Sequence, residues 1–194
     1  MKRVFVAINL QDKIKNKLSE FQKDIESEFE FCPIKWAKKD SFHITLLFLG
    51  SVKSEQIPEV IKIVKRIALQ NPVFSMNLNK ICYAPIGVIP PKMIWIKSKK
   101  NEQAVKIKKE MEKEFLNLNI SSFRAENRNF IPHITLGRIK QWDWRGLDQD
   151  EKPKIENDIS LNFQIKSIDV MESRLKRSGA EHTILQTCEL KKKA

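Results

Sequence analysis

The sequence predicts a fold of mixed strands and helices that is built from two similar halves. The first observation is the order of patterns, because each half alternates extended apolar stretches with amphipathic helices. The second is the tetrad His-Ile-Thr-Leu, which begins at His43 and again at His133, 90 residues later (133 − 43 = 90). One copy in each half indicates an internal duplication.

The N-terminal half is predicted to hold two helices among short strands. Apolar residues recur at steps of three and four over 11–29 and 54–70, which is typical of helices with one buried face. Ser54 is a suitable N-cap for the second of these helices. A loop that contains proline and glycine is expected at 84–91. Patterns rich in β-branched, aromatic or alternating apolar residues predict strands at 3–9, 35–37, 42–50 and 73–81.

The C-terminal half is predicted to hold one long helix, at 101–118, with lysine and glutamate on its polar face. The stretch 141–158 has no clear period, which predicts a mobile surface segment or a short helix. A basic turn at 174–179 is expected to join the last two strands. Strands are predicted at 93–97, 130–139, 163–172 and 181–190.

Composition indicates a globular protein outside the membrane. A chain of 194 residues is long enough for one good-sized domain or for two small lobes that share a core. No apolar run approaches the ~18–20 residues that span a bilayer. The apolar start breaks at Asn9, so we expect no export signal. Cys32, Cys82 and Cys188 are far apart and form no CxxC pair, which predicts reduced thiols in the cytoplasm.

The chain is strongly basic, with a formal net charge of +12. Such an excess favours an anionic partner, and nucleic acid is the usual candidate. The alternative is a set of lysine-rich helix faces that do no more than solvate the protein. Charge alone does not choose between these two interpretations.

The repeated tetrad presents its polar residues on one side of a strand. Because side chains alternate along a strand, His43 and Thr45 point to one face while the intervening apolar residues point to the other. His133 and Thr135 repeat this arrangement. A single tetrad is most simply an ordinary half-exposed stretch of strand. Two copies that hold two of only three histidines favour a functional site.

Packing of the two halves about a pseudo-twofold axis would bring both tetrads to one cleft. A neutral imidazole can take a proton from attacking water, while a protonated one gives a proton to a leaving oxygen. Threonine hydroxyls can donate hydrogen bonds to the non-bridging oxygens of a phosphodiester. This chemistry needs no metal. Zinc, nucleotide and serine-hydrolase sites fit less well, because HExxH, cysteine-pair, GxxxxGK[ST], GxGxxG and GxSxG motifs are absent from the sequence.

The paired tetrads resemble the two HxTx motifs of the two-histidine phosphoesterase superfamily. Within it the chain is similar to the bacterial and archaeal RNA 2′,3′-cyclic phosphodiesterases, also called 2′-5′ RNA ligases. The similarity runs nearly from end to end. It is carried by RVFVAINL at the start, Trp36, HITLLFLG at 43–50, MIWI after Pro91, FIPHITLGR at 130–138 and SRLKRSGAEHTIL at 173–185.

The resemblance implies a single bilobal α+β domain over residues 1–194. In it, duplicated antiparallel sheets with outer helices line a central cleft that carries the two motifs. The implied reaction opens a 2′,3′-cyclic phosphate at an RNA end to a 2′-phosphate, without a cofactor. His43 would be the proton donor and His133 the acceptor that activates water. The two motifs are identical, so their sequence does not itself orient the pair.

Further roles follow from the same resemblance. Thr45, Thr135 and Arg138 would contact the phosphate, with a plain surface charge as the alternative for Arg138. Phe48 would stack on a terminal base, with core packing as the alternative. The chain departs from the family at Asn129, where proline is common, and at His182, where tyrosine is common. We interpret His182 as structural.

Two other functions remain as alternatives. Ligation could run only as the reverse of the cyclic-phosphate step, because the sequence lacks the KxDG-type lysine motif of ATP-dependent ligases. A non-catalytic RNA-binding module would use the basic surface but would not need two proton-transfer groups. The substrate could be a tRNA fragment, a short oligonucleotide or a small nucleotide. A monomer is the default, since no heptads are present.

Overall fold

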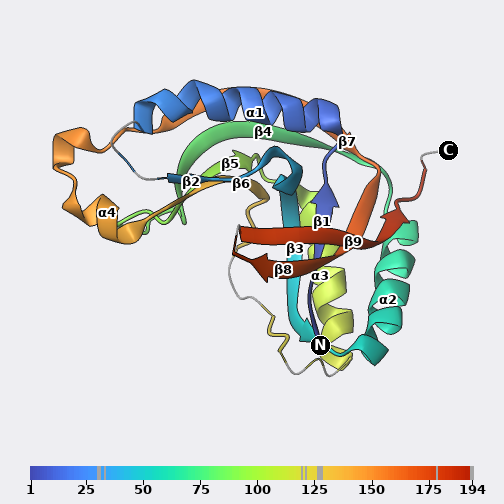
Figure 1. Ribbon diagram of the computed structural model, residues 1–194. Coiled ribbons are helices and arrows are strands. Elements are labelled where there is room, and N and C mark those ends of the chain that lie inside the picture. The colour runs from blue at the N-terminus through green and yellow to red at the C-terminus, as the bar shows by residue number, and fades with distance from the viewer. Residues whose placement is uncertain are drawn as a thin grey trace.

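The computed structural model describes residues 1–29, 32, 34–118, 120, 122–125, 129–177 and 179–192. These residues form two antiparallel sheets that are set at an angle to each other (Figure 1). The strands are β1 (Lys2–Asn9), β2 (Ile34–Trp36), β3 (His43–Val52), β4 (Phe74–Ala84), β5 (Met93–Ser98), β6 (His133–Ile139), β7 (Glu156–Ile165), β8 (Ser167–Lys176) and β9 (Gly179–Glu189). The α-helices are α1 (Asp12–Glu26), α2 (Ile57–Gln70), α3 (Glu102–Asn117) and α4 (Gln141–Gly146).

The order of the strands confirms an α+β fold with an internal duplication. The first sheet runs β3-β1-β8-β9 and the second runs β2-β6-β5-β4-β7. The pair β1–β3 corresponds to β5–β6, and the pair β8–β9 corresponds to β4–β7. Each half therefore lends strands to the other half's sheet: β4 follows β3 along the chain but pairs with β5, and β8 follows β7 but pairs with β1. This exchange ties the halves together.

A buried apolar cluster extends across both sheets. Inward-facing residues of β1, β3, β5 and β6 have at most about 1% of their surface exposed, and they include Val6, Ile44, Ile96 and Ile134. Helices α2 and α3 pack on each other and against the first sheet. On the second sheet, the side-chain amide of Gln22 in α1 donates to the Leu136 carbonyl of β6 at 2.9 Å. Burial of the apolar faces is the main stabilising contribution to this arrangement.

The N-terminal elements lie where the sequence predicts them, except for one helix start. Helix α2 begins at Ile57 and its N-cap is Gln56, while Ser54 lies in a short 3₁₀ turn before it. The prediction of Ser54 as the N-cap was therefore wrong. Pro58 gives the physical reason, since proline has no N–H to pair and is tolerated in the first turn of a helix, and so fixes where the helix starts.

The predicted strand at 163–172 was also wrong. This stretch contains the end of β7 and the start of β8, which belong to different sheets and meet at Lys166. The stretch 141–158 was predicted to be a mobile surface segment or a short helix. It contains the short helix α4, but its last residues belong to β7. Strand β7 is an edge strand that pairs only with β4. Its alternate residues are exposed and polar, so its N-terminal part resembles a surface segment in sequence.

Candidate active site

The two tetrads have the same local structure on corresponding strands. Ala7 of β1 lies opposite Thr45, and Trp95 of β5 lies opposite Thr135. The register of each strand pair shifts at the same place, between Val6 and Ala7 and between Ile94 and Trp95. The residues from His43 to Leu49 and from His133 to Ile139 follow one pattern of burial, with histidine and threonine half-buried and the apolar residues between them buried. The alternation expected from the sequence is present in both copies.

Each histidine is oriented by a backbone carbonyl two residues before it. The Nδ1 atom of His43 lies 2.7 Å from the Ser41 carbonyl oxygen, and that of His133 lies 2.7 Å from the Ile131 carbonyl oxygen. A carbonyl oxygen can only accept, so Nδ1 carries the proton in both rings. Nε2 is then the ring nitrogen that can accept a proton. In the first tetrad, the Thr45 hydroxyl lies 3.1 Å from Nε2 of His43 and donates to it when the ring is neutral.

The surroundings of His43 favour its neutral form. Burial lowers the pKa of His43 from 6.5 to about 4, and the Ser41 carbonyl opposes this in part. His182 and His133, when their rings are protonated, and Lys15 also lower the pKa of His43. The effect of His133 on His43 indicates that the two tetrads lie near each other, and strands β3 and β6 are in contact. At neutral pH and without a ligand, His43 is therefore uncharged.

Different aromatic rings contact the two histidines. The indole of Trp95 stacks on the ring of His133, with centroids 3.5 Å apart and planes 17° apart. His43 instead contacts Phe5 at 5.2 Å and the edge of His182 at 5.0 Å, again between ring centroids. Sequence reasoning missed Trp95, although its place in the alternating MIWIK stretch puts it on the face opposite to the buried isoleucines. Only the strand register shows that this face is the one that carries the tetrad.

The structure places the two other predicted site residues at equivalent positions. Phe48 and Arg138 each follow their histidine by five residues (48 − 43 = 5; 138 − 133 = 5), and both side chains are exposed. Phe48 is 62% exposed and contacts Phe5 at a centroid distance of 5.9 Å, so the alternative of core packing is wrong. The Arg138 guanidinium lies beside the sulfur of Met93, 3.6 Å from it. Both side chains are available to a ligand.

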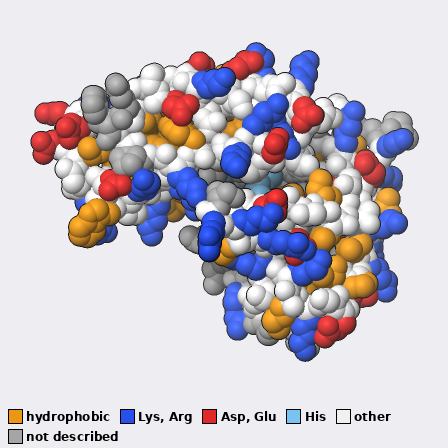
Figure 2. Space-filling view, viewed as in Figure 1, with side chains coloured by type: hydrophobic (Ala, Val, Ile, Leu, Met, Phe, Trp, Pro, Cys, Tyr) orange, Lys and Arg blue, Asp and Glu red, His pale blue; other side chains and the backbone are white. Residues whose placement is uncertain are grey.

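Basic side chains surround the histidines at the surface. In the space-filling view, histidine is visible near the middle of the molecule, where the two sheets meet, and lysine and arginine side chains lie around it (Figure 2). Within the described part of the chain, His, Cys, Asp and Glu side chains form no group of three or more that could hold a metal ion. None of the described helices is both long and apolar enough to cross a bilayer.

Two His-x-Thr-x tetrads on corresponding strands of a duplicated α+β fold define the class of two-histidine phosphoesterases. A family model described as "LigT like Phosphoesterase" matches residues 8–95 and again residues 96–181. The chain belongs to this family. The two matches meet between Trp95 and Ile96, so that each contains one tetrad.

Similar proteins include several named RNA 2′,3′-cyclic phosphodiesterase. The one from Methanocaldococcus jannaschii is 30% identical over 188 residues, which cover 95% of this chain and 98% of the relative. The one from Thermotoga maritima is 28% identical, with coverage of 96% and 95%. Among solved structures, a Thermus thermophilus protein aligns over 99% of this chain and 100% of its own with a TM-score of 0.81 and 23% identity. E. coli LigT complexed with 3′-AMP aligns over 97% of this chain and 98% of its own with a TM-score of 0.75 and 19% identity. These two structures share the fold.

Proposed function

We propose that the protein hydrolyses 2′,3′-cyclic phosphate ends of RNA to 2′-phosphates, with His43 and His133 as a metal-independent acid–base pair. The observation that carries this proposal is the matched geometry of the tetrads, in which a carbonyl fixes Nδ1 of each ring and leaves Nε2 for proton transfer. The relatives named RNA 2′,3′-cyclic phosphodiesterase supply the substrate class.

In the proposed reaction, neutral His133 takes a proton from water as the water oxygen bonds to phosphorus. The bond between phosphorus and the 3′ oxygen breaks, and protonated His43 gives its proton to that oxygen. The products are a 2′-phosphate and a 3′-hydroxyl. Thr45 and Thr135 donate to non-bridging oxygens, whose negative charge Arg138 also stabilises. In this role the Thr45 hydroxyl turns from His43 to the phosphate.

The role of His43 as the donor depends on the substrate. A donor must be protonated, but the pKa of His43 in the free protein is about 4. A phosphate anion next to the ring favours its charged form and raises that pKa. In this proposal His43 is therefore protonated when the substrate is bound. In the free protein at neutral pH, the His43 ring is uncharged.

The remaining parts of the proposal concern binding and location. Phe48 is exposed beside the first tetrad and offers a ring on which the terminal base stacks. The buried cluster that extends over both sheets supports a single domain over residues 1–194. We take a monomer as the default state. Cys32, Cys82 and Cys188 are buried and unpaired, as suits the reducing cytoplasm. Reverse 2′-5′ ligation uses the same groups but competes with water in large excess.

A non-catalytic RNA-binding module is the alternative function. Such a module needs cations on its surface, and it gains nothing from two rings that are held in one tautomer by matched carbonyls. The matched tetrads therefore favour the enzyme.

Product analysis of 2′,3′-cyclic AMP treated with the protein in the presence of EDTA tests the proposal. We expect 2′-AMP as the product, at a rate that the chelator does not change. Formation of 3′-AMP would contradict the proposed bond cleavage. Loss of activity with EDTA that added zinc restores would contradict the two-histidine mechanism, because a zinc-bound hydroxide would then be the nucleophile.

A further inference from the structure

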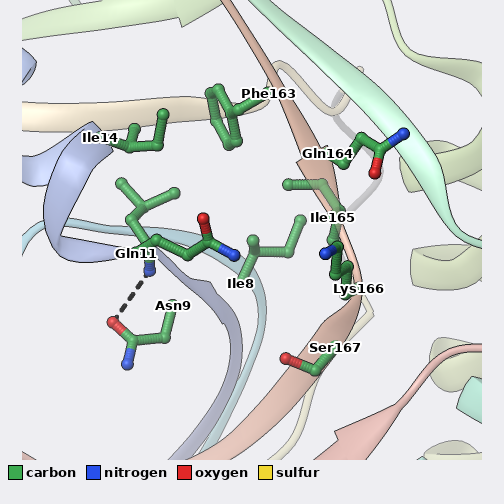
Figure 3. Close-up of a pocket in the computed structure, with 10 residues that line it drawn as sticks. Ile8, Asn9, Gln11, Ile14, Phe163, Gln164, Ile165, Lys166 and Ser167 are labelled. Atoms are coloured by element: carbon green, nitrogen blue, oxygen red, sulfur yellow. Dashed lines mark hydrogen bonds between the residues drawn. The ribbon is translucent and has the colours of Figure 1, made fainter.

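Two cavities of the described part of the chain lie outside the tetrads and differ greatly in size. The smaller, of about 50 Å³, lies between the start of α1 and the β7–β8 junction, with Ile8, Ile14 and Ile165 around it (Figure 3). Asn9 also lines it, and its side-chain oxygen accepts from the Leu10 N–H at 3.0 Å (Figure 3). This volume holds a water molecule or two but no nucleotide. The larger cavity, of about 1150 Å³, exceeds the usual size of small-molecule sites.

The larger cavity is a groove over strands β4 and β5, which we call the β4–β5 groove. Its floor includes Lys80 and Cys82 of β4 and Lys97 of β5. One wall is the loop that follows β4, at 86–91, and the other is the segment from α4 to the start of β7, at 144–156. Within the loop, the Ile89 side chain is 92% exposed.

The floor of this groove continues directly into the candidate active site. Lys97 lies opposite His133 in the β5–β6 pair, and Lys80 lies opposite Lys97 in the β4–β5 pair. Directly opposite residues in a sheet share a face, and neighbouring strands are about 5 Å apart. A basic row thus runs from His133 through Lys97 to Lys80 in steps of about 5 Å, and Asp158 of β7 follows Lys80 at the edge of the sheet. In the next row on the same face, Trp95 lies between Thr135 and Cys82.

The β4–β5 groove is lined with an excess of positive charge. Five basic residues line it, against two acidic ones, and they are Lys80, Lys97, Arg145, Lys152 and Lys154, with Asp150 and Glu156 as the acidic pair. Lys80 lies 3.3 Å from Glu156, whose side chain is 81% exposed. The Lys80 side chain is 26% exposed, so only the Glu156 side of the ion pair is open to solvent, and this carboxylate can move away when a phosphate binds. The charge suits a polyanion that enters from the active site.

We propose that the β4–β5 groove binds the nucleotides that precede the cyclic end of an RNA strand. Phosphates of the strand lie along the basic row of Lys97 and Lys80 and against the far wall of Arg145, Lys152 and Lys154. The exposed apolar loop at 86–91 contacts bases. The inference rests on the proposed function, because the cyclic end must sit between the two tetrads for the strand to run this way. It makes the substrate an RNA strand rather than a free cyclic nucleotide.

The first test compares 2′,3′-cyclic AMP with a pentaribonucleotide that ends in a 2′,3′-cyclic phosphate. We expect kcat/KM for the pentamer to exceed that for the mononucleotide by a factor on the order of 10 or more, since the extra phosphates gain cationic contacts. The advantage should shrink as salt is added. Equal values of kcat/KM for the two substrates would overturn the groove proposal and leave the proposed function standing.

A groove variant with a matched control makes the test specific. Arg145→Ala/Lys154→Ala removes two exposed cations from the far wall without touching the sheet. Lys62→Ala/Lys106→Ala removes two cations from α2 and α3, where the lysine side chains are 76% and 55% exposed. We expect the groove variant to reduce the advantage of the pentamer about 10-fold, and to make the slope of log affinity against log salt shallower by about 1.4, or about 0.7 for each cation lost. The control should behave as the parent protein does.

Binding measurements keep the two proposals separate. Fluorescence anisotropy of a labelled pentamer with a plain 3′-phosphate reports the groove even if the protein hydrolyses neither cyclic substrate, a result that would overturn the proposed function. Weaker binding by the groove variant alone supports the groove. Equal loss of binding by the groove and control variants would mean that net charge alone attracts RNA, and the groove proposal would fall.

Discussion

Strands β3 and β6 carry the same four residues, but each has different neighbours. Strand β3 is an edge strand, whereas β6 has β2 on one side and β5 on the other. Gly137 follows the second tetrad where Leu47 follows the first, and a Cβ atom on Gly137 would lie 2.6 Å from the Ile34 side chain of β2. Within this sheet β5 pairs with the second tetrad, while β2 pairs with Gly137 to Ile139, the residues that follow it. The first tetrad is enclosed by side chains that reach it from β1 and β9.

The comparison separates what a tetrad determines from what its surroundings determine. In both copies the ring is held by a carbonyl two residues upstream, at 2.7 Å. The partner rings differ, because Trp95 stacks on His133 while Phe5 and His182 contact His43. The tetrad therefore fixes the orientation of each histidine, while the neighbouring strands determine which rings contact it. Under the proposed mechanism, these different surroundings let two identical motifs take opposite roles in acid–base catalysis.

Removing either histidine should have the largest effect. We expect His43→Ala and His133→Ala each to lower kcat for cyclic phosphate hydrolysis by a factor on the order of 10²–10⁴, because each removes one proton-transfer group. KM should change much less. His182→Ala is the control, since it removes the third histidine without removing a proton-transfer group, and it should cost less than about 10-fold. Normal turnover by both active-site variants would make the tetrads structural.

Removal of a threonine hydroxyl should lower activity less than removal of a histidine, and by a similar factor for the two threonines. Thr45→Val and Thr135→Val keep the shape of the side chain and remove one hydroxyl donor to the phosphate. A hydrogen bond to a charged group contributes roughly 1.5–3 kcal/mol, which corresponds to a loss of about 10- to 100-fold in kcat/KM. Steady-state kinetics of the two variants checks this prediction. A loss in only one of them would show that the phosphate is bound by one half of the protein alone.

Replacement of Trp95 should affect only the second tetrad. Trp95→Leu keeps an apolar side chain on β5 but removes the ring stacked on His133. Aromatic pairs contribute about 0.5–1.5 kcal/mol beyond area burial, so kcat should fall by roughly 2- to 10-fold as the ring of His133 becomes less firmly held. Circular dichroism and the thermal midpoint test whether the fold is kept. An unchanged kcat with an intact fold would show that the carbonyl alone orients His133.

The smallest effect concerns the proton affinity of His43. NMR titration of the free protein should show the His43 ring protonating near pH 4, because burial and the nearby cationic groups lower its pKa. His182→Phe removes one of these cations and should raise the pKa of His43 slightly. Addition of 2′-AMP should raise it further, since a phosphate anion stabilises the charged ring. A His43 pKa that stays near 4 with the nucleotide bound would contradict its role as the proton donor.

The low pKa of His43 also determines how its contribution to the free energy of unfolding changes with pH. An unfolded histidine titrates near 6.5, so between about pH 6.5 and 4 the unfolded chain binds more protons at this position than the folded protein. The contribution of His43 to the free energy of unfolding is therefore complete above this window and falls as the pH is lowered through it. Urea unfolding at several pH values, with and without the His43→Ala substitution, measures this contribution.

The sequence by itself determined the local features of the site. Period-two alternation placed His43 and Thr45, and likewise His133 and Thr135, on one face of a strand, because a strand with one buried face sorts apolar from polar residues. The same local signals located most helices and strands. They failed at Lys166, where β7 ends and β8 begins, because an edge strand that is polar on alternate positions resembles a surface segment.

Only the tertiary structure decided which residues surround each tetrad. Trp95 lies next to His133 because β5 pairs with β6 in one register, and His182 reaches His43 because β9 lies in the same sheet as β1 and β3. The same register places Lys97 and Lys80 in a row with His133 and so creates the floor of the β4–β5 groove. These partners are far apart along the chain, and a shift of one residue would turn each side chain to the opposite face. Burial of both sheets in a shared core selects the register, and local sequence does not record that choice.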